Sequence, residues 1–320
     1  MLVETPSASA LRTGIPVVFG TSKLPPGEAC FDVLDAYAEA GGSVLDCAAV
    51  YQLGEAERSV GRWLARHAGA RPQLLTKGGH PGSDWSPRLD LAAVRSDLEQ
   101  SLERLGVPSV EFYLLHRDDE SKPVAALADV IDVVRASGLV RWVGVSNWRT
   151  PRLAQLLALT QVDIVSNYFG LGLPAGPPAL PGVVSSFDAE GHALFARTGL
   201  PLLAWSAMSA GFFAEPMNGS SMAKACANNP ESISRREVLL RLARKYDRGA
   251  DAILIRWLAT AARHLVPLVS STNPGRVSAL MAAALDTSLD PAVADLISHL
   301  GAGGDPVLRP LLLPDERPQW

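Results

Sequence analysis

The order of apolar and polar positions along this chain indicates short buried strands separated by amphipathic helices. Segments between the strands place apolar side chains three or four residues apart, as at Val94, Leu98, Leu102 and Leu105, which is the spacing of a helix that buries one face. The other runs are short and rich in β-forming residues, and we expect eight strands, at residues 15–19, 43–45, 73–76, 110–115, 140–145, 162–165, 200–204 and 265–269. Strand and helix therefore alternate from one end of the sequence to the other.

This alternation predicts an α/β fold with a closed parallel sheet. Strands joined through helices must run parallel, and the crossovers between them are right-handed. Eight such repeats can close on themselves and remove both edges of the sheet. Although 320 residues would allow two domains, a barrel of this size commonly forms one. We therefore expect a (β/α)8 TIM barrel, with residues 1–320 as a single domain.

Two connections are too long to be plain turns. They follow the sixth and seventh strands, at residues 170–189 and 209–234. Long loops in compact domains usually shape or cover a site, so we expect both at the rim of the barrel as walls or lids on the substrate side. The polar composition of the second loop leaves a disordered insertion as the alternative. Residues 301–320 are rich in Gly and Pro and predict a tail that either packs across the barrel or hangs free.

Composition narrows the class of partner. Charged residues make up 19% of the chain and the net charge is −4, so the basic face required by nucleic acid or an anionic membrane is not expected. No apolar run approaches the roughly 20 residues that cross a bilayer, and the first 14 residues do not have the pattern of a secretory signal. Three cysteines, an odd number without paired spacing, favour a reducing compartment, and we expect the cytoplasm. The composition favours a small-molecule partner and does not indicate an oligomeric state.

Four side chains with suitable chemistry stand at or just beyond expected strand ends, and these ends converge on one rim of a barrel. They are Asp46, Tyr51, Lys77 and His116. A lysine ammonium beside a tyrosine stabilises the phenolate and lowers the pKa of the phenol from near 10. An aspartate would hold the lysine, and a histidine would donate a hydrogen bond to a substrate oxygen. The set predicts a proton-transfer centre at which Tyr51 protonates a carbonyl oxygen.

Each of these residues also has a simpler structural explanation. Asp46 and Lys77 could be a buried ion pair between neighbouring strands, Tyr51 an ordinary aromatic residue near a helix, and His116 a core histidine. At average residue usage, however, all four types fall at the required places with a chance on the order of 10⁻⁵. The joint pattern therefore favours the catalytic interpretation.

The same motifs resemble the aldo-keto reductase superfamily. The first is residues 41–51, GGSVLDCAAVY, followed by Gly54-x-x-Glu57 and Gly61; the second is LTK at 75–77 and the third is YLLH at 113–116. They match the Asp, Tyr, Lys and His tetrad of that family. The resemblance continues through GVSN at 144–147 and AWSAMSAG at 204–211, and it covers roughly residues 17–284.

The resemblance implies reduction of an aldehyde or ketone by NAD(P)H, or the reverse reaction, with Tyr51 as general acid and no metal. Ser146 and Asn147 resemble the pair that bonds the nicotinamide carboxamide, and Trp205 takes the place of the aromatic residue that stacks on the ring. In isolation these residues would be read as a helix cap and a core aromatic. The full set of cofactor residues implied is Gly20, Thr21, Ser146, Asn147, Tyr168, Trp205, Ser206, Ser270, Ser271, Thr272 and Arg276.

The chain departs from the family pattern on the cofactor side. Tyr168 replaces a common Gln, Thr272 stands where a cation is usual, and Ala279 and Leu280 replace an acidic-amide pair. A helix start at Pro274, capped by Thr272 or Asn273, would still cradle a pyrophosphate through its free amides. Because Arg276 is the remaining nearby cation for a ribose phosphate, we predict NADPH as cofactor, with NADH as a possible substitute.

Two other functions stay open from the sequence. The altered cofactor positions are compatible with a regulatory or accessory subunit that keeps the barrel and has little catalysis. Asp118 and Asp119 follow His116 closely, so a metal-dependent barrel lyase or hydrolase is a further alternative, although a solvated loop start is the simpler reading of the two aspartates. The complete tetrad favours the carbonyl reductase over both.

Overall fold

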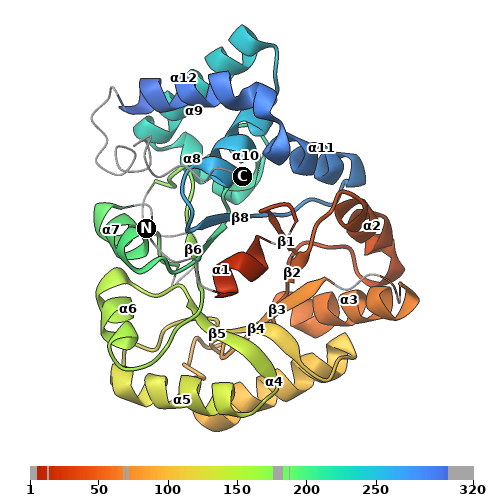
Figure 1. Cartoon of the computed structure of the whole chain (residues 1–320), viewed down its shortest axis with the longest axis vertical. Coiled ribbons are helices and arrows are strands. Elements are labelled where there is room, and N and C mark those ends of the chain that lie inside the picture. The colour runs from red at the N-terminus through yellow and green to blue at the C-terminus, as the bar shows by residue number, and fades with distance from the viewer. Residues whose placement is uncertain are drawn as a thin grey trace.

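The computed structural model describes residues 6–12, 14–67, 69, 72–175, 183–186 and 188–301. Its strands form a closed barrel in chain order, in which each strand pairs in parallel with its sequence neighbours and β8 pairs with β1. Helices surround this ring (Figure 1). The predicted eight-stranded α/β barrel is therefore confirmed, and the expected tail beyond residue 301 lies outside the described residues.

The strands lie close to their predicted positions. Their bounds are β1 Val18–Gly20, β2 Val44–Asp46, β3 Gln73–Gly78, β4 Val110–Leu115, β5 Val140–Ser146, β6 Val165–Tyr168, β7 Leu202–Trp205 and β8 Leu265–Val269. The first and seventh begin later than predicted, beyond Pro16 and Pro201, because proline has no N–H to donate to a ladder. The later start of β6 has no comparable explanation in the sequence.

Helices follow the strands as the apolar spacing predicts. Their bounds are α1 Pro6–Leu11, α2 Phe31–Glu39, α3 Glu55–Arg66, α4 Leu91–Leu105, α5 Val124–Ala136, α6 Thr150–Leu157, α7 Ala189–Thr198, α8 Ser221–Ala227, α9 Pro230–Tyr246, α10 Ala250–Thr260, α11 Pro274–Leu285 and α12 Asp290–Gly301, with short 3-10 turns η1 Gly27–Cys30, η2 Tyr51–Gly54, η3 Ser209–Gly211 and η4 Thr287–Leu289. Within the described residues no single helix is long and apolar enough to cross a membrane, and only the bent pair α11 with 287–300 meets that criterion when taken together.

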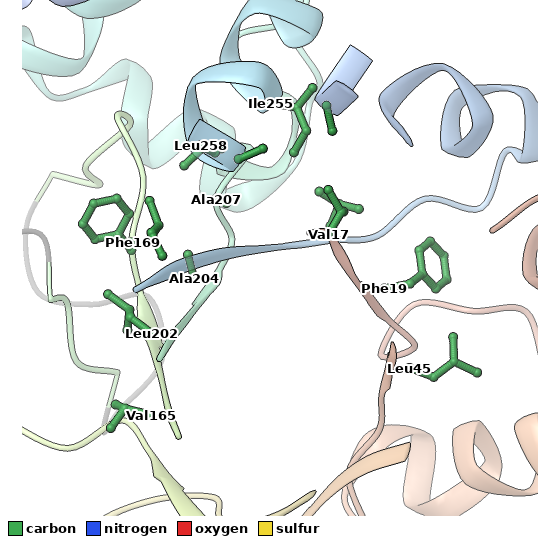
Figure 2. Packing of buried hydrophobic residues seen from close by; sticks show 14 of the residues in the cluster. Val17, Phe19, Leu45, Val165, Phe169, Leu202, Ala204, Ala207, Ile255 and Leu258 are labelled. Carbon is green, nitrogen blue, oxygen red and sulfur yellow. The ribbon is translucent and has the colours of Figure 1, made fainter. Parts of the chain in front are cut away.

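The core has two apolar layers. Inside the barrel, residues such as Phe112 and Leu114 of β4 pack with one another, whereas their strand neighbours Tyr113 and Leu115 face the helices, as the alternation of side chains along a strand requires. Figure 2 shows part of the outer layer, where Ile255 and Leu258 of α10 lie beside the barrel strands.

Helix α1 closes the amino-terminal end of the barrel. Leu11 is fully buried in the inner apolar layer, and α1 lies across the middle of the ring in Figure 1. Gln73, the first residue of β3, donates to the Ala10 carbonyl at 2.8 Å, and Arg12 donates to the Leu265 carbonyl at the start of β8 at 2.7 Å. With this end closed, the carboxyl ends of the strands are left to form the site.

The long connection after β7 is folded. It contains η3, α8 and the start of α9, each helix being capped by a side chain: Ser220 accepts from Ala223 N–H, and Asn229 accepts from Glu231 and Ser232 N–H. Ser232 also bonds both backbone groups of Leu173, at 2.7 and 2.8 Å, which joins this segment to the connection after β6. The alternative of a disordered insertion is therefore wrong for residues 209–234.

One buried ion pair joins helix α3, which directly follows the turn carrying Tyr51, to the barrel and to helix α4. Glu57 of α3 is fully buried, and its carboxylate accepts from Thr76 Oγ1 of β3 and from Arg104 Nε of α4, both at 2.6 Å. Because both oxygens have partners, the pair is satisfied although it is out of water. Breaking such a pair leaves a buried charge without compensation, which costs more than the pair itself contributes.

We predict that Arg104→Met lowers the free energy of unfolding by about 3–5 kcal/mol, since it leaves the buried Glu57 carboxylate without its positively charged partner. Urea denaturation measures this. Arg95→Met is the matched control, because Arg95 pairs with Glu99 on the exposed face of the same helix, and its loss should be below about 0.5 kcal/mol. Equally small losses of unfolding free energy in both variants would show that the Glu57–Arg104 pair contributes no more than an exposed ion pair.

Candidate active site

The four predicted catalytic residues line one cleft at the carboxyl ends of the strands. Asp46 ends β2, Lys77 lies in β3, His116 follows β4 and Tyr51 begins η2. The cleft has a volume of about 1220 Å³, which exceeds the roughly 300–1,000 Å³ of a pocket for one drug-sized ligand. It therefore has room for a large cofactor and a small substrate together.

Lys77 is the centre of the hydrogen bonding at this site. An ammonium has three donors, and all three are used: Asp46 Oδ1 lies at 2.5 Å, the Cys47 carbonyl oxygen at 2.9 Å and Tyr51 Oη at 3.1 Å. Burial acts to lower the pKa of Lys77, but Asp46 and Tyr51 outweigh it and the pKa is raised. The lysine thus stays charged, and because Tyr51 Oη accepts from it, the proton of Tyr51 can point elsewhere.

The turn that carries Tyr51 has an unusual backbone. Gln52 and Leu53 have φ angles of 51° and 55°, a left-handed conformation that costs non-glycine residues roughly 1–2 kcal/mol each. Leu53 is 88% exposed, so no packing of its side chain explains the turn, while Gln52 Nε2 donates to the Leu24 carbonyl at 2.7 Å. Strain of this kind gathers at functional sites, and here it places the ring of Tyr51 beside Lys77.

Burial raises the pKa of Tyr51 above its ordinary value, with Lys77 acting in the opposite direction and Asp46 adding to the rise. The expectation that Lys77 would bring this pKa down is therefore wrong in its net direction, because loss of solvent outweighs one ammonium. Burial also raises the pKa of Asp46, against the effect of Lys77. Tyr51 is consequently protonated at neutral pH, as a general acid must be.

His116 is held neutral beside the tyrosine. Its pKa lies well below the ordinary value because it is buried and because Lys77, Arg117 and His80 repel a proton there. The imidazole ring lies 5.7 Å from that of Tyr51, edge to face. Its Nδ1 is buried and has no hydrogen-bond partner among the described residues. A neutral imidazole that lines the cleft is suited to donate a hydrogen bond to a ligand oxygen.

Most of the implied cofactor residues line the same cleft, on the side of β5 to β8. Trp205 Nε1 is buried and has no hydrogen-bond partner in the part of the chain that the structure describes, and the Tyr168 ring meets the Trp205 ring edge to face at 5.3 Å. The tyrosine that replaces the usual Gln thus supports the tryptophan. The implied residues that line the cleft are Ser146, Asn147, Tyr168, Trp205, Ser206, Ser270, Ser271, Thr272 and Arg276.

Gly20 and Thr21, by contrast, have structural roles. A Cβ at Gly20 would lie 2.7 Å from Leu268 Cδ2, and the buried Thr21 hydroxyl donates to the Asp46 carbonyl at 2.9 Å. Neither lines the cleft among the described residues, whereas the next two residues, Ser22 and Lys23, do. The sequence had no signal for this shift, because the strand end was located only to within a few residues.

The start of α11 after β8 agrees with the predicted helix start. Pro274 is the first residue and Asn273 is the cap, with Oδ1 accepting from Arg276 N–H at 3.0 Å. The Arg276 guanidinium pairs with Asp251 at 3.1 Å and is 40% exposed. Leu280, at one of the positions of the usual acidic-amide pair, lines the cleft with an apolar side chain. This corner can therefore contact phosphate and ribose groups, but with one guanidinium.

The two aspartates after His116 are engaged in other contacts. Asp118 accepts two hydrogen bonds from Arg152, at 2.6 and 3.0 Å, and Asp119 accepts from the Ser121 hydroxyl at 2.5 Å. Across the described part of the chain, no group of three or more His, Cys, Asp or Glu side chains could hold a metal ion. The metal-dependent alternative therefore has no ligand set in these residues.

Comparisons with known proteins agree with this geometry. The chain is 26% identical over 256 residues to a 6-dehydroglucose reductase of Novosphingobium aromaticivorans, covering 77% of each chain. It is 25% identical over 158 residues to the Schizosaccharomyces pombe aldo-keto reductase yakc [NADP(+)], covering 48% of this chain and 45% of that one. The structure of aldo-keto reductase AKR11C1 from Bacillus halodurans superposes with a TM-score of 0.71 at 18% identity, covering 88% and 91% of the two chains.

The family description itself spans most of the molecule. The aldo/keto reductase family matches residues 16–301, which include the barrel strands and the four predicted catalytic residues that line the cleft. The chain therefore belongs to the aldo/keto reductase family of NAD(P)-dependent oxidoreductases.

Proposed function

We propose that this protein reduces a small aldehyde or ketone to the alcohol, or runs the reverse reaction, with Tyr51 as the proton donor. The observation that carries this proposal is the bond from Lys77 Nζ to Tyr51 Oη at 3.1 Å inside the cleft. A bound reduced nicotinamide would supply the hydride. All three donors of Lys77 are used, one of them by Tyr51, and this favours catalysis over the accessory-subunit alternative. That alternative is supported by the altered cofactor positions alone.

Three side chains would act on the carbonyl oxygen of the substrate. Tyr51 gives its phenolic proton to the oxygen as hydride reaches the carbon, so that one C–H and one O–H bond form. Lys77 stabilises the phenolate left behind, and His116, being neutral, donates a hydrogen bond that orients the oxygen. Because Nδ1 of His116 has no acceptor among the described residues, the tautomer with the proton on Nε2 is the one that suits this role.

Other residues would hold the cofactor. Both protons of the Asn147 amide are used, toward the Ser146 hydroxyl at 2.8 Å and the His116 carbonyl at 3.3 Å. Among the described residues its Oδ1 accepts one long hydrogen bond, from Val184 N–H at 3.4 Å, and it can also accept from a nicotinamide carboxamide. Trp205, whose side chain lines the cleft, would lie against the ring. Arg276 would bind the ribose phosphate, which leads us to propose NADPH before NADH.

We expect Tyr51→Phe to lower kcat for aldehyde reduction by about 100- to 10,000-fold, the usual contribution of a positioned acid. The dissociation constant of NADPH, followed by fluorescence titration, should change by less than about 3-fold, because the hydroxyl contributes to the chemical step. Tyr246→Phe is the matched control, since the Tyr246 hydroxyl bonds Asp295 on the outside of the barrel. Full activity in Tyr51→Phe would remove the mechanism.

The pH profile of activity should reflect the ionisation of Tyr51 and not that of His116. Since the pKa of Tyr51 is raised, the acid form persists through neutral pH, and kcat/KM for reduction should be flat between about pH 6 and 8 and fall at alkaline pH. Alcohol oxidation needs the phenolate and should rise over the same alkaline range. A limb near pH 6.5 in steady-state assays would contradict the neutral His116 inferred from its lowered pKa.

Cofactor preference can be tested at one residue. We expect Arg276→Met to raise the dissociation constant of NADPH about 10- to 100-fold, as for the loss of a charged hydrogen bond, and to leave that of NADH nearly unchanged. Asp251→Asn is the paired control, because it frees Arg276 from its ion pair and should preserve or tighten NADPH binding. Fluorescence titration of wild type and of each variant with each cofactor measures these dissociation constants. Equal effects of Arg276→Met on the binding of the two cofactors would contradict the assignment.

A further inference from the structure

Arg117 is a buried cation of the cleft that the proposed reaction does not use. It follows His116 directly, is 9% exposed and lines the cleft. It makes no hydrogen bond or ion pair with any residue that the structure describes, and its Nε is buried without a partner. Burial lowers the pKa of Arg117, as expected of a guanidinium that has lost water without gaining a carboxylate.

The acidic groups around Arg117 are already committed. Asp118 is bonded by Arg152 and Asp119 by Ser121. Among the described residues that line the cleft, the one carboxylate is Asp46, which bonds Lys77. Within the described ranges, therefore, no neighbouring anion compensates the charge of Arg117.

Other buried arginines of this chain show the usual arrangement. Arg235, 4% exposed, bonds Glu231 and the Leu171 carbonyl. Arg256, 6% exposed, bonds Asp290 at 2.8 Å and the Ala284 carbonyl at 2.9 Å. A buried charge without such partners lowers stability, so Arg117 is the exception that an external ligand would explain.

Arg117 lies on the substrate side of the cleft. It follows β4, whereas the α11 start and Arg276 follow β8, and these strands stand across the closed ring from each other (Figure 1). The charge of Arg117 acts on the ionisation of Tyr51 and His116, the groups that would hold the substrate oxygen. A phosphate of a cofactor at α11 is therefore not the group that Arg117 faces.

We propose that Arg117 binds an oxyanion on the carbonyl substrate, so that the preferred substrates are aldehydes or ketones bearing a carboxylate or a phosphate. The planar guanidinium matches two oxygens of either group. Lys23, an exposed cation that also lines the cleft, adds attraction at the rim. This inference rests on the proposed reductase function and names its substrate class.

The test compares charged aldehydes with neutral analogues that lack the oxyanion. Succinic semialdehyde is paired with its methyl ester for the carboxylate, and glyceraldehyde 3-phosphate with glyceraldehyde for the phosphate. In wild type we expect kcat/KM to favour at least one charged member by about 10- to 100-fold, largely through KM. Whichever pair shows the larger ratio identifies the oxyanion.

Variants of Arg117 show whether this side chain causes the ratio of kcat/KM between charged and neutral aldehydes. Arg117→Met should abolish the preference, and Arg117→Lys should keep part of it, because the charge remains without the planar fork. Arg141→Met removes the same charge from an exposed residue of β5 and should leave the ratio unchanged. The melting temperature of Arg117→Met should be equal to or above that of wild type, since a buried unpaired charge is lost; a lower melting temperature with an unchanged ratio would make Arg117 structural.

A binding measurement separates this inference from the proposed function. Calorimetric titration with 4-hydroxybutanoate, the alcohol product, needs no turnover and should show binding to wild type that Arg117→Met lacks. If neutral and charged aldehydes are reduced equally well in every variant, the oxyanion site is overturned and the reductase stands. If no carbonyl is reduced but the titration still depends on Arg117, the oxyanion site stands and the reductase function fails.

Discussion

The site depends on one ammonium whose three donors are all bonded. Lys77 reaches Asp46, the Cys47 carbonyl and Tyr51 at once, and this is possible because β2 and β3 are neighbouring strands that end at the same rim. A lysine held by a carboxylate at such close range remains charged although it is 2% exposed. Its third donor then fixes the position of the tyrosine oxygen at the cleft.

Bonds between neighbouring elements hold both walls of the cleft in place. The buried Glu57 carboxylate joins α3, β3 and α4, so the left-handed turn carrying Tyr51 is anchored close to its strained residues. The other wall of the cleft comes from the segments after β6 and β7, which are joined through Ser232. The strand ends carry the proposed reacting groups, and the connections after β6 and β7 shape the space around them.

Electrostatics divides the cleft into two regions. On the β8 side, Arg276 shares its charge with Asp251 and faces the place proposed for the cofactor. On the β4 side, Arg117 has no described partner and lies near a neutral His116 and a protonated Tyr51. Such an arrangement gives up some stability of the free protein, and a negatively charged ligand would restore it on binding.

The amino-acid sequence by itself determined the eight-stranded barrel and the gathering of Asp46, Tyr51, Lys77 and His116 at one cleft. Strand ends in a parallel barrel must meet at one rim, and the positions of the motifs indicate where those strands end. It could not determine the direction of the Tyr51 pKa shift, since burial is set by residues far away in the chain. Nor could it separate Thr21, which bonds the Asp46 carbonyl, from Ser22 and Lys23, which line the cleft. Whether the cation after His116 had a partner was likewise decided only by the tertiary structure, because Asp118 and Asp119 are adjacent to Arg117 in sequence but bond other side chains in space.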